Sequence, residues 1–317
     1  MNHDATERER ERILADRSVI VTGAGAGLGR AYALLASRLG ASVVVNDINM
    51  SAAEAVVGEI TSAGGRAVAD GTSVSDHNLA PQVVDVALHV FGKLDAVINN
   101  AGTTHGTSFV DTPYQLLRDQ LAIHLEGAYL ISQRAFPHMA ANGYGRFVFT
   151  SSASGVFGRQ MGVAYASAKC AVIGLMNVVA LEGAEVGVLA NAVLPVAQTD
   201  IAARAPVSPD GGGAGWVGDL SNNPRYTPVF VAPLVAYLAS PLCQSTHGIY
   251  SAVGGRYAQV HFALSSGWRS GDGSVPPSPT ELGRHWDEIS SHEDYRYPMS
   301  VADEVNFELA RHSSESV

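Results

Sequence analysis

Tyr165 and Lys169 stand four residues apart in a segment with helical periodicity, so their side chains share one face of the helix. A phenol is a weak base at neutral pH because its unperturbed pKa is about 10. An ammonium group one helical turn away favours the phenolate, and Lys169 supplies that charge. Ser152, thirteen residues before Tyr165, would hold a substrate oxygen by a hydrogen bond. These residues predict removal of the proton of an alcohol, which loss of hydride from its carbon requires.

Each of these signals has an ordinary alternative. A Tyr-x-x-x-Lys spacing arises by chance in many helices, Ser152 could be an ordinary serine at a strand end, and Ser151 or Ser154 could be mistaken for it. The lysine is informative because the chain has only one other, Lys93. The order of the motifs along the chain carries the prediction, and no single motif does.

A glycine-rich turn, Thr22-Gly23-Ala24-Gly25-Ala26-Gly27-Leu28-Gly29, separates a strand-like run from a helical pattern. This order is what a dinucleotide phosphate site requires. Small residues let the backbone approach the pyrophosphate, and the helix N-terminus offers free N–H groups. A tight turn without a ligand is the alternative. The predicted cofactor contacts in the turn are Gly23, Gly27, Leu28 and Gly29.

Asp47 ends the second predicted strand, eighteen residues after Gly29. Its carboxylate can accept hydrogen bonds from the adenosine ribose and would repel a 2′-phosphate, so NAD is favoured over NADP. Two alternatives stay open. Asp47 could be a turn aspartate before Asn49, and Arg30 in the first turn of the helix could bind a phosphate.

Short β-branched runs alternate with longer amphipathic runs, which predicts βαβ units on a parallel sheet. We expect an α/β fold: a single Rossmann-type, doubly wound parallel sheet of about seven strands, flanked by helices and followed by a C-terminal helical extension. The predicted strands are residues 19–22, 42–46, 66–69, 96–99, 146–150, 187–194 and 248–253. The predicted helices lie near residues 28–39, 51–63, 77–91, 113–141, 164–185 and 230–239.

Three regions follow from this pattern: a charged N-terminal tail (residues 1–15), a catalytic domain (16–260) and a C-terminal extension (261–317). Residues 200–228 are too rich in proline and glycine for a regular element. We interpret them as a substrate-binding lid, with a disordered loop as the alternative.

A short helix is predicted in the extension. Ser278-Pro279-Thr280-Glu281 forms a capping box, after which Leu282, Trp286 and Ile289 would line one helix face. This face should pack on the core or on a neighbouring subunit.

The composition limits the kinds of partner. Lys+Arg total 20 against Asp+Glu 30, and the resulting charge of −10 argues against a nucleic-acid or anionic-membrane surface. The sequence holds no metal-ligand spacing, and Cys170 and Cys243 are expected to be buried free thiols. Because the N-terminus lacks an apolar signal region and no apolar run reaches roughly 18 residues, we expect no membrane insertion and a cytoplasmic location.

Over roughly residues 16–255 the chain resembles the short-chain dehydrogenase/reductase family. The matching residues are Thr22, Gly23, Gly27, Gly29, Asn99, Asn100, Ala101, Gly102, Ser152, Tyr165, Lys169, Asn191, Pro195 and Thr199. The resemblance implies that Tyr165 is the base, that Ser152 holds the substrate oxygen and that Lys169 also binds the nicotinamide ribose. It implies further cofactor contacts by Asn100, Ala101, Gly102, Pro195 and Thr199. Ala26, where NADP-preferring relatives often carry a basic residue, agrees with NAD.

The chain departs from the family pattern at three places. Ser73-Val74 replaces the usual Asp-Val pair at the adenine, where a hydroxyl and a backbone N–H could still serve. His124 stands where the long helix usually carries the asparagine that completes a catalytic tetrad and organises a proton-relay water. The histidine could hold the same water or be a packing residue. Val196 follows Pro195 where Pro-Gly is usual.

Four segments (residues 45–47, 124–127, 150–155 and the tail around Trp286) resemble a narrower group. It is the (3R)-hydroxyacyl-CoA dehydrogenase domain of peroxisomal multifunctional enzymes, which includes a 17β-hydroxysteroid dehydrogenase, with its stand-alone bacterial relatives. The resemblance implies an NAD-dependent alcohol dehydrogenase of lipid metabolism or steroid catabolism, acting on a (3R)-hydroxyacyl-CoA or a hydroxysteroid.

Two other functions remain as alternatives. The first is a reductase of 3-oxoacyl carrier protein or of general ketones. Asp47 counts against it, since biosynthetic reduction commonly uses NADPH. The second, more remote, is a non-catalytic dinucleotide sensor, against which the intact Ser152, Tyr165 and Lys169 count.

The partners expected are a small-molecule substrate and a second copy of the chain. An acyl-CoA needs cations for its phosphates, which Arg204, Arg225, Arg256 and Arg269 could supply. Family members commonly pair through two long helices, here residues 113–141 and 164–185, so a homodimer or homotetramer is expected. Four apolar positions fit such a face, with ordinary core packing as the alternative: Val172, Leu175, Met176 and Val179.

Overall fold

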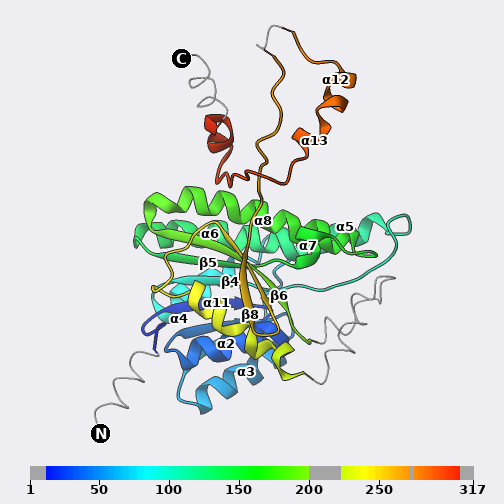
Figure 1. Ribbon diagram of the computed structural model, residues 1–317. Helices are drawn as coiled ribbons and strands as arrows, with labels where there is room; N and C mark the ends of the chain where they lie inside the picture. The colour runs from blue at the N-terminus through cyan, green and yellow to red at the C-terminus, as the bar shows by residue number, and fades with distance from the viewer. Residues whose placement is uncertain (1–11, 200–222, 272–274, 308–317) are drawn as a thin grey trace. The chain divides into compact units, whose positions relative to one another are not determined.

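A single eight-stranded sheet with helices on both faces forms the body of the protein (Figure 1). The computed structural model describes residues 12–199, 223–271 and 275–307. The chain divides into two units, Met1–Gln259 and Val260–Val317. The predicted α/β, doubly wound fold is confirmed, with one strand more than expected.

The strands are short, and those at the centre of the sheet are buried along their whole length, as parallel strands covered on both faces must be. Each predicted strand is present within two residues of its expected ends. In chain order they are β1 (Ser18–Thr22), β2 (Ser42–Asn46), β3 (Arg66–Asp70), β4 (Ala96–Asn99), β5 (Gly145–Thr150), β6 (Val188–Val196), β7 (Gly248–Val253) and β8 (Arg256–Val260).

The strand order is β3-β2-β1-β4-β5-β6-β7-β8, and the six pairings from β3 through to β7 are parallel. The chain winds outward from β1 to β3, then returns to place β4 on the other side of β1. The carboxyl ends of β1 and β4 therefore flank the point where the winding direction reverses, which is where ligands bind in such sheets.

The sequence analysis did not predict β8. It follows β7 after only Gly254-Gly255, both with positive φ, and a connection this short permits only antiparallel pairing. Its side chains are exposed or half-buried, because it forms the edge of the sheet. An edge strand with one polar and one charged residue lacks the continuous β-branched run that identifies the buried strands.

Helices cover the sheet in two layers, with α2, α3 and α11 on one face and α4, α6 and α8 on the other (Figure 1). In chain order the helices of the first unit are α2 (Gly27–Arg38), α3 (Met50–Ser62), α4 (Gln82–Phe91), α5 (Tyr114–Leu121), α6 (Gly127–Ala141), α7 (Ala153–Phe157), α8 (Val163–Gly183) and α11 (Ala232–Leu238). Shorter turns are the π turn η1 (Ala122–Glu126) and the 3₁₀ turns η2 (Ala184–Val186), η3 (Pro224–Tyr226) and η4 (Pro228–Phe230).

One helix predicted over residues 113–141 consists of α5 and α6 joined by η1. A π turn inserts one extra residue and rotates the side chains on it relative to the flanking turns, and such turns are frequent at functional sites. His124 lies on this turn.

Helix α8 has a different buried face from the one expected. Val172 and Met176 are buried in the core, so their assignment to an outer pairing face is wrong. The exposed apolar residues of the helix are Val178 and Leu181. Because α8 is apolar around most of its circumference, the sequence pattern could not identify its outer face. Cys170 is also exposed on α8, contrary to expectation, whereas Cys243 is buried.

Residues Val163–Val186, which include α8, are long and apolar enough to cross a membrane by length and composition alone. The expectation that no segment reaches that length is therefore wrong. In the structure α8 packs against β5 and β6 and carries the buried Lys169, as a core helix of a globular domain does.

The second unit contains α12 (Pro279–Arg284) and α13 (Trp286–Ile289). The predicted capping box is present, since the Ser278 hydroxyl accepts a hydrogen bond from the Glu281 N–H at 3.2 Å. The helix breaks at His285, which stacks on Trp268 with ring centroids 4.2 Å apart. The predicted single helix is thus two short helices, and Leu282 and Trp286 are exposed in the single chain. Packing of this face on the core or on a neighbouring subunit stays a prediction.

The predicted lid lies mostly outside the described residues, because residues 200–222 are among those the structure does not describe. Its end, residues 223–228, forms the 3₁₀ turn η3 and the start of η4. Asn223 caps η3 by accepting a hydrogen bond from the Arg225 N–H.

Substitution of Gly183 by alanine tests the close approach of α8 to β6, with Gly58 of α3 as the control position. A Cβ at Gly183 would lie 2.3 Å from the carbonyl oxygen of Val188, whereas a Cβ at Gly58 of α3 would meet nothing within 4 Å. We expect Gly183→Ala to lower the free energy of unfolding by about 1–3 kcal/mol. Gly58→Ala should raise it by roughly 0.5–1 kcal/mol, as alanine does in an exposed helix. Urea unfolding measures both, and equal effects of the two substitutions would contradict the described packing.

Candidate active site

The glycine turn after β1 is held by close backbone contacts. Gly23 has a φ of +62°, which favours glycine, and a Cβ at Gly29 would lie 2.1 Å from the carbonyl oxygen of Gly23. Neither position accepts a side chain without moving the turn. The turn leads into α2, on whose first turn Leu28 lies.

The N-terminus of α2 carries backbone N–H groups that no side chain caps, since its N-cap residue, Ala26, has no side-chain hydrogen bond. Such a terminus attracts a phosphate through its free donors and its partial positive charge. Thr199 borders the turn, because a Cβ at Gly27 would lie 3.4 Å from the Thr199 methyl group. The turn therefore fits the pyrophosphate of a dinucleotide.

Hydrogen bonds connect the carboxyl ends of β1 and β4. The Thr22 hydroxyl accepts from the N–H groups of Asn100 at 2.9 Å and Ala101 at 3.0 Å. The Asn100 amide in turn donates to the carbonyl oxygens of Thr22 at 3.0 Å and Gly23 at 3.2 Å. The predicted contacts Asn100, Ala101 and Gly102 thus lie beside the glycine turn.

Asp47 lies at the carboxyl end of β2, with its carboxylate against the glycine turn. One oxygen accepts from the Gly25 N–H at 2.9 Å, and the other from the Asn49 N–H at 2.9 Å. The second bond is the turn contact that the alternative interpretation expected, and the first ties the carboxylate to the cofactor turn. Each oxygen keeps lone pairs that can accept from a ribose hydroxyl.

Ser73 and Val74 follow β3. The Ser73 hydroxyl is hydrogen-bonded to that of Ser75 at 3.0 Å. Val74 is buried against Gly127, where a Cβ would lie 2.7 Å from the Val74 carbonyl oxygen. Pro195 lies near the end of β6, on the same edge of the sheet.

Ser152, Tyr165 and Lys169 meet at the carboxyl end of β5. Ser152 is the N-cap of α7, and its hydroxyl lowers the pKa of Tyr165, which lies on the first turn of α8. The ammonium of Lys169 donates to the carbonyl oxygen of Thr150 at 2.6 Å and lies 5.8 Å from the centroid of the Tyr165 ring. The neighbouring Ser151 is buried and donates to the Lys169 carbonyl oxygen instead, so it does not face the phenol.

His124 is buried beside this group. Its Nε2 donates to the Thr103 carbonyl oxygen at 2.8 Å, and its ring meets the Tyr165 ring edge-on with centroids 5.4 Å apart. A Cβ at Gly102 would lie 2.3 Å from the imidazole, so the absence of a side chain there makes room for the histidine.

The family model for short chain dehydrogenases matches residues 17–207 of this chain. The chain belongs to this family. Two sequence relatives illustrate the match. Peroxisomal multifunctional enzyme type 2 of Drosophila melanogaster is 39% identical over 263 residues, which cover 79% of this chain and 41% of that protein. A putative short-chain type dehydrogenase/reductase of Mycobacterium tuberculosis is 36% identical over 288 residues, covering 87% of this chain and 94% of that protein.

Solved structures agree with the sequence relatives. The full-length Drosophila melanogaster enzyme matches with a TM-score of 0.78 and 33% identity, covering 95% of this chain and 50% of that chain. A 7α-hydroxysteroid dehydrogenase complexed with NADH and 7-oxo glycochenodeoxycholic acid matches with a TM-score of 0.69 and 29% identity, covering 79% of this chain and 97% of that chain. This short chain dehydrogenase spans half or less of the multifunctional enzyme that it matches.

Burial changes the proton affinities in the active site of this short chain dehydrogenase. It lowers the pKa of Lys169 to about 7. Burial also raises the pKa of Tyr165, opposed by the hydrogen bond with Ser152 and the positive charge of Arg159. The sequence analysis assigned the side-chain charge that favours the phenolate to Lys169, beside the charge of an oxidised nicotinamide, and did not identify Arg159. The sequence analysis expected a fully charged Lys169. The structure differs because burial removes water from the ammonium group, which opposes its ionisation.

His124 is neutral because burial, reinforced by the nearby Lys169 charge, lowers its pKa well below the usual range. With the proton on Nε2, its Nδ1 can only accept a hydrogen bond. The histidine therefore carries no charge, and its Nδ1 can accept a hydrogen bond from a water, as one of its two predicted roles requires. Its part in proton relay stays a prediction.

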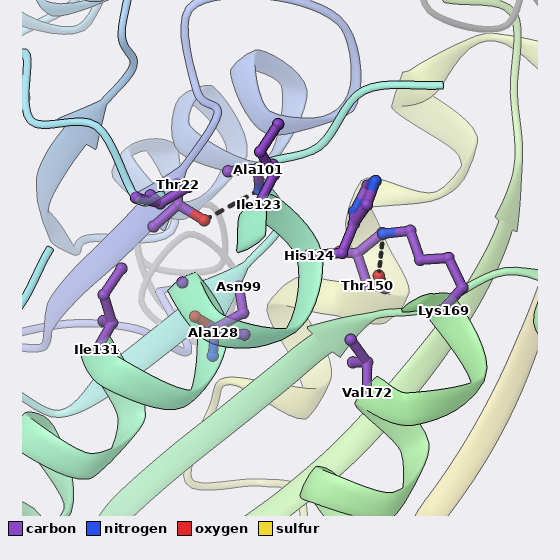
Figure 2. Close-up of a pocket in the computed structure, with 12 residues that line it drawn as sticks. Thr22, Asn99, Ala101, Ile123, His124, Ala128, Ile131, Thr150, Lys169 and Val172 are labelled. Carbon is purple, nitrogen blue, oxygen red and sulfur yellow. Dashed lines mark hydrogen bonds between the residues drawn. The ribbon is translucent and has the colours of Figure 1, made fainter. Parts of the chain in front are cut away.

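Behind the glycine turn, a cavity of about 10 Å³ lies between β4, β5 and the helices η1, α6 and α8 (Figure 2). This is about the space that one water occupies. Three buried polar atoms at the cavity's residues have no hydrogen-bond partner among the described residues: Asn99 Oδ1, His124 Nδ1 and Thr150 Oγ1. Lys169 also lines the cavity, which thus offers a water both a cation and acceptors.

Replacing Lys169 tests how much its buried ammonium group lowers the free energy of unfolding. The pKa of Lys169 is about 7 in the folded protein, against an ordinary value of 10.5. The cost of burying the charge is therefore full below pH 7 and disappears as the pH rises toward 10.5, because the unfolded chain then loses its proton as well. We expect the free energy of unfolding of Lys169→Met to exceed that of the wild type by a few kcal/mol at mildly acid pH, since one pKa unit corresponds to about 1.4 kcal/mol.

Urea unfolding at a series of pH values measures this difference, which should shrink with rising pH. Lys93→Met removes a half-exposed lysine that pairs with Asp95, as the control, and should change stability by about 1 kcal/mol or less. A Lys169→Met protein that is less stable than the wild type at every pH would overturn the assigned burial cost.

Proposed function

We propose that this short chain dehydrogenase is an NAD-dependent oxidoreductase that interconverts a secondary alcohol and a ketone, with a (3R)-hydroxyacyl-CoA as its substrate. The observation that carries the proposal is the meeting of Ser152, Tyr165 and Lys169 beside the glycine turn. The small-molecule substrate would enter at the carboxyl edge of the sheet, where ligands bind in this class of fold.

The residues divide the chemistry among them. The Tyr165 oxygen takes the proton of the substrate hydroxyl during oxidation and returns it during reduction. Ser152 donates a hydrogen bond to the substrate oxygen, where negative charge develops. Lys169, held by the Thr150 carbonyl, adds positive charge beside the phenol. A bound nicotinamide supplies the acceptor for the hydride.

NAD is proposed over NADP because of Asp47. Its carboxylate lies against the glycine turn, where it would accept hydrogen bonds from the ribose of NAD and repel a 2′-phosphate. Arg30, the residue that could have bound that phosphate, is paired with Glu59. This pairing supports NAD.

The acyl-CoA substrate is proposed from the resemblance to the multifunctional enzymes. A hydroxysteroid is the second candidate, because a solved relative is a 7α-hydroxysteroid dehydrogenase. Of the cations considered for CoA, Arg204 lies outside the described residues. Arg225 and Arg256 belong to the first unit and Arg269 to the second, so their convergence on one ligand stays a prediction.

We also propose a homodimer or homotetramer, as is common in the family. The exposed apolar residues Tyr129, Val178 and Leu181 on α6 and α8 support this. Of the residues first considered, Val172 and Met176 are buried in the core, whereas Leu175 and Val179 are half-buried. Burying such residues at a symmetric interface would remove them from water.

Turnover with NAD tests the proposed function. We expect oxidation of a (3R)-hydroxyacyl-CoA but not of its (3S) isomer. Tyr165→Phe should lose at least roughly a hundredfold in kcat, since a general base typically contributes this much or more. Formation of NADH, followed by its absorbance, is the measurement, with a 17β-hydroxysteroid, a 3-oxoacyl carrier protein and a simple secondary alcohol in the panel.

Each other result points elsewhere. Turnover of the steroid alone would make the protein a hydroxysteroid dehydrogenase, and reduction of the carrier-protein thioester alone would make it a biosynthetic reductase. Binding of NAD without turnover of any substrate would favour a dinucleotide sensor.

The cofactor assignment has its own test. Asp47→Ser removes the repulsive charge and shortens the hydrogen-bonding group, so we expect the NAD to NADP ratio of kcat/KM to fall roughly 10- to 100-fold. Asp85→Ser removes an equally charged residue that pairs with Arg134, away from the glycine turn, and should leave the ratio unchanged. An unchanged ratio in Asp47→Ser would remove Asp47 from cofactor selection.

A further inference from the structure

We propose that Arg159 is a positioning residue that supplies the permanent positive charge for the phenolate of Tyr165, beside the titrating charge of Lys169. The inference rests on the proposed function, in which Tyr165 is the base. It adds to that function a second cation, outside the Ser152, Tyr165 and Lys169 group.

The geometry places two cations at one ring. Arg159 lies in the turn between α7 and α8, and its guanidinium carbon is 5.8 Å from the centroid of the Tyr165 ring. The ammonium of Lys169 is also 5.8 Å from that centroid. The turn keeps the arginine close to the backbone, since a Cβ at Gly162 would lie 3.2 Å from Arg159 Nε.

Two of the nitrogen atoms of the Arg159 guanidinium lack a hydrogen-bond acceptor in the part of the chain that the structure describes. Nε and Nη2 of Arg159 are buried and have no hydrogen-bond partner among the described residues. A buried charged donor without an acceptor is costly, so such an arrangement is uncommon in a purely structural role. It is expected at functional sites, where a negative charge forms during the reaction.

Among the described residues, four groups lie beside the Tyr165 side chain, and one of these four has a fixed positive charge. Ser152 contributes a hydrogen bond, and His124 is neutral. Lys169 has a pKa of about 7, so its charge is incomplete near neutral pH. An arginine stays protonated throughout this range. Of the positive charges that the described side chains bring to the phenol, only that of Arg159 is therefore complete at neutral and higher pH.

The sequence also explains why this residue escaped notice. Arg159 stands in the segment Gly158-Arg159-Gln160-Met161-Gly162, which has no helical or strand periodicity. A basic residue six positions before Tyr165 has no obvious meaning until the turn folds back on the start of α8. The positive φ of Gly158 and Met161 reflects how tightly the turn bends.

The pH dependence of kcat/KM for alcohol oxidation tests the proposal. In Arg159→Met the acid limb should move up by about one pH unit, with about a tenfold loss of kcat/KM on that limb. Arg159→Lys, which keeps a positive charge, should recover most of the shift. Arg134→Met removes the charge of an exposed arginine on α6, paired with Asp85, and should leave the profile unchanged.

A direct titration of Tyr165 separates this inference from the proposed function. The tyrosinate absorbance is followed against pH without cofactor or substrate, and the curve of Tyr165→Phe is subtracted. The same subtraction in the Arg159→Met background should give a transition at higher pH. Thermal melting of each variant at neutral pH confirms that it is folded.

The outcomes are distinct. A shifted tyrosine titration without turnover of any substrate would support the role of Arg159 while the proposed function fails. If neither the Tyr165 titration nor the pH profile of kcat/KM shifts in Arg159→Met, the inference is overturned. This includes the case in which the only change is a higher KM for an anionic substrate. That last result would make Arg159 a substrate contact.

Discussion

The hydrogen bonds between Thr22 and Asn100 hold together the two strand ends on which the site depends. β1 and β4 are adjacent in the sheet but are separated in the chain by two βα units. The Thr22 hydroxyl accepts from two successive N–H groups after β4, and the Asn100 amide returns to the turn after β1. The glycine turn and the segment after β4, which carry most of the predicted cofactor contacts, are thus fixed relative to one another.

The chemistry at the next strand is controlled by desolvation. β5 carries Thr150 and leads into Ser152, and α8 places Tyr165 and Lys169 against them. Burial opposes the charge on the lysine and opposes ionisation of the phenol at the same time. The site therefore disfavours both charges, and Ser152 and Arg159 partly offset the effect of burial on the pKa of Tyr165.

Helix α8 joins stability and function in one element. It packs along β5 and β6 and carries Tyr165 and Lys169, the residues of the proposed chemistry, near its N-terminal end. The same helix places exposed Val178 and Leu181 on its outer side. A substitution on α8 therefore acts on the core, the active site or the surface according to the helix face it occupies, which spacing alone did not reveal.

Much of this protein was determined by its sequence alone. Continuous β-branched runs, the glycine turn and the alternation of elements identified seven strands, their parallel arrangement and the edge where Asp47, Ser152 and Tyr165 lie. These features are local: each depends on side-chain types over a few residues, and the parallel sheet follows from covered strands and short connections.

Tertiary structure alone decided the rest. It set the buried face of α8, since an apolar circumference has no unique inner side, and it produced the π turn that carries His124. It also brought Arg159 to the Tyr165 ring, and lowered the pKa of Lys169 by removing water from around it. Desolvation and charge proximity depend on which groups pack together in space. The order of residues along the chain does not specify how far apart those groups lie in the folded protein.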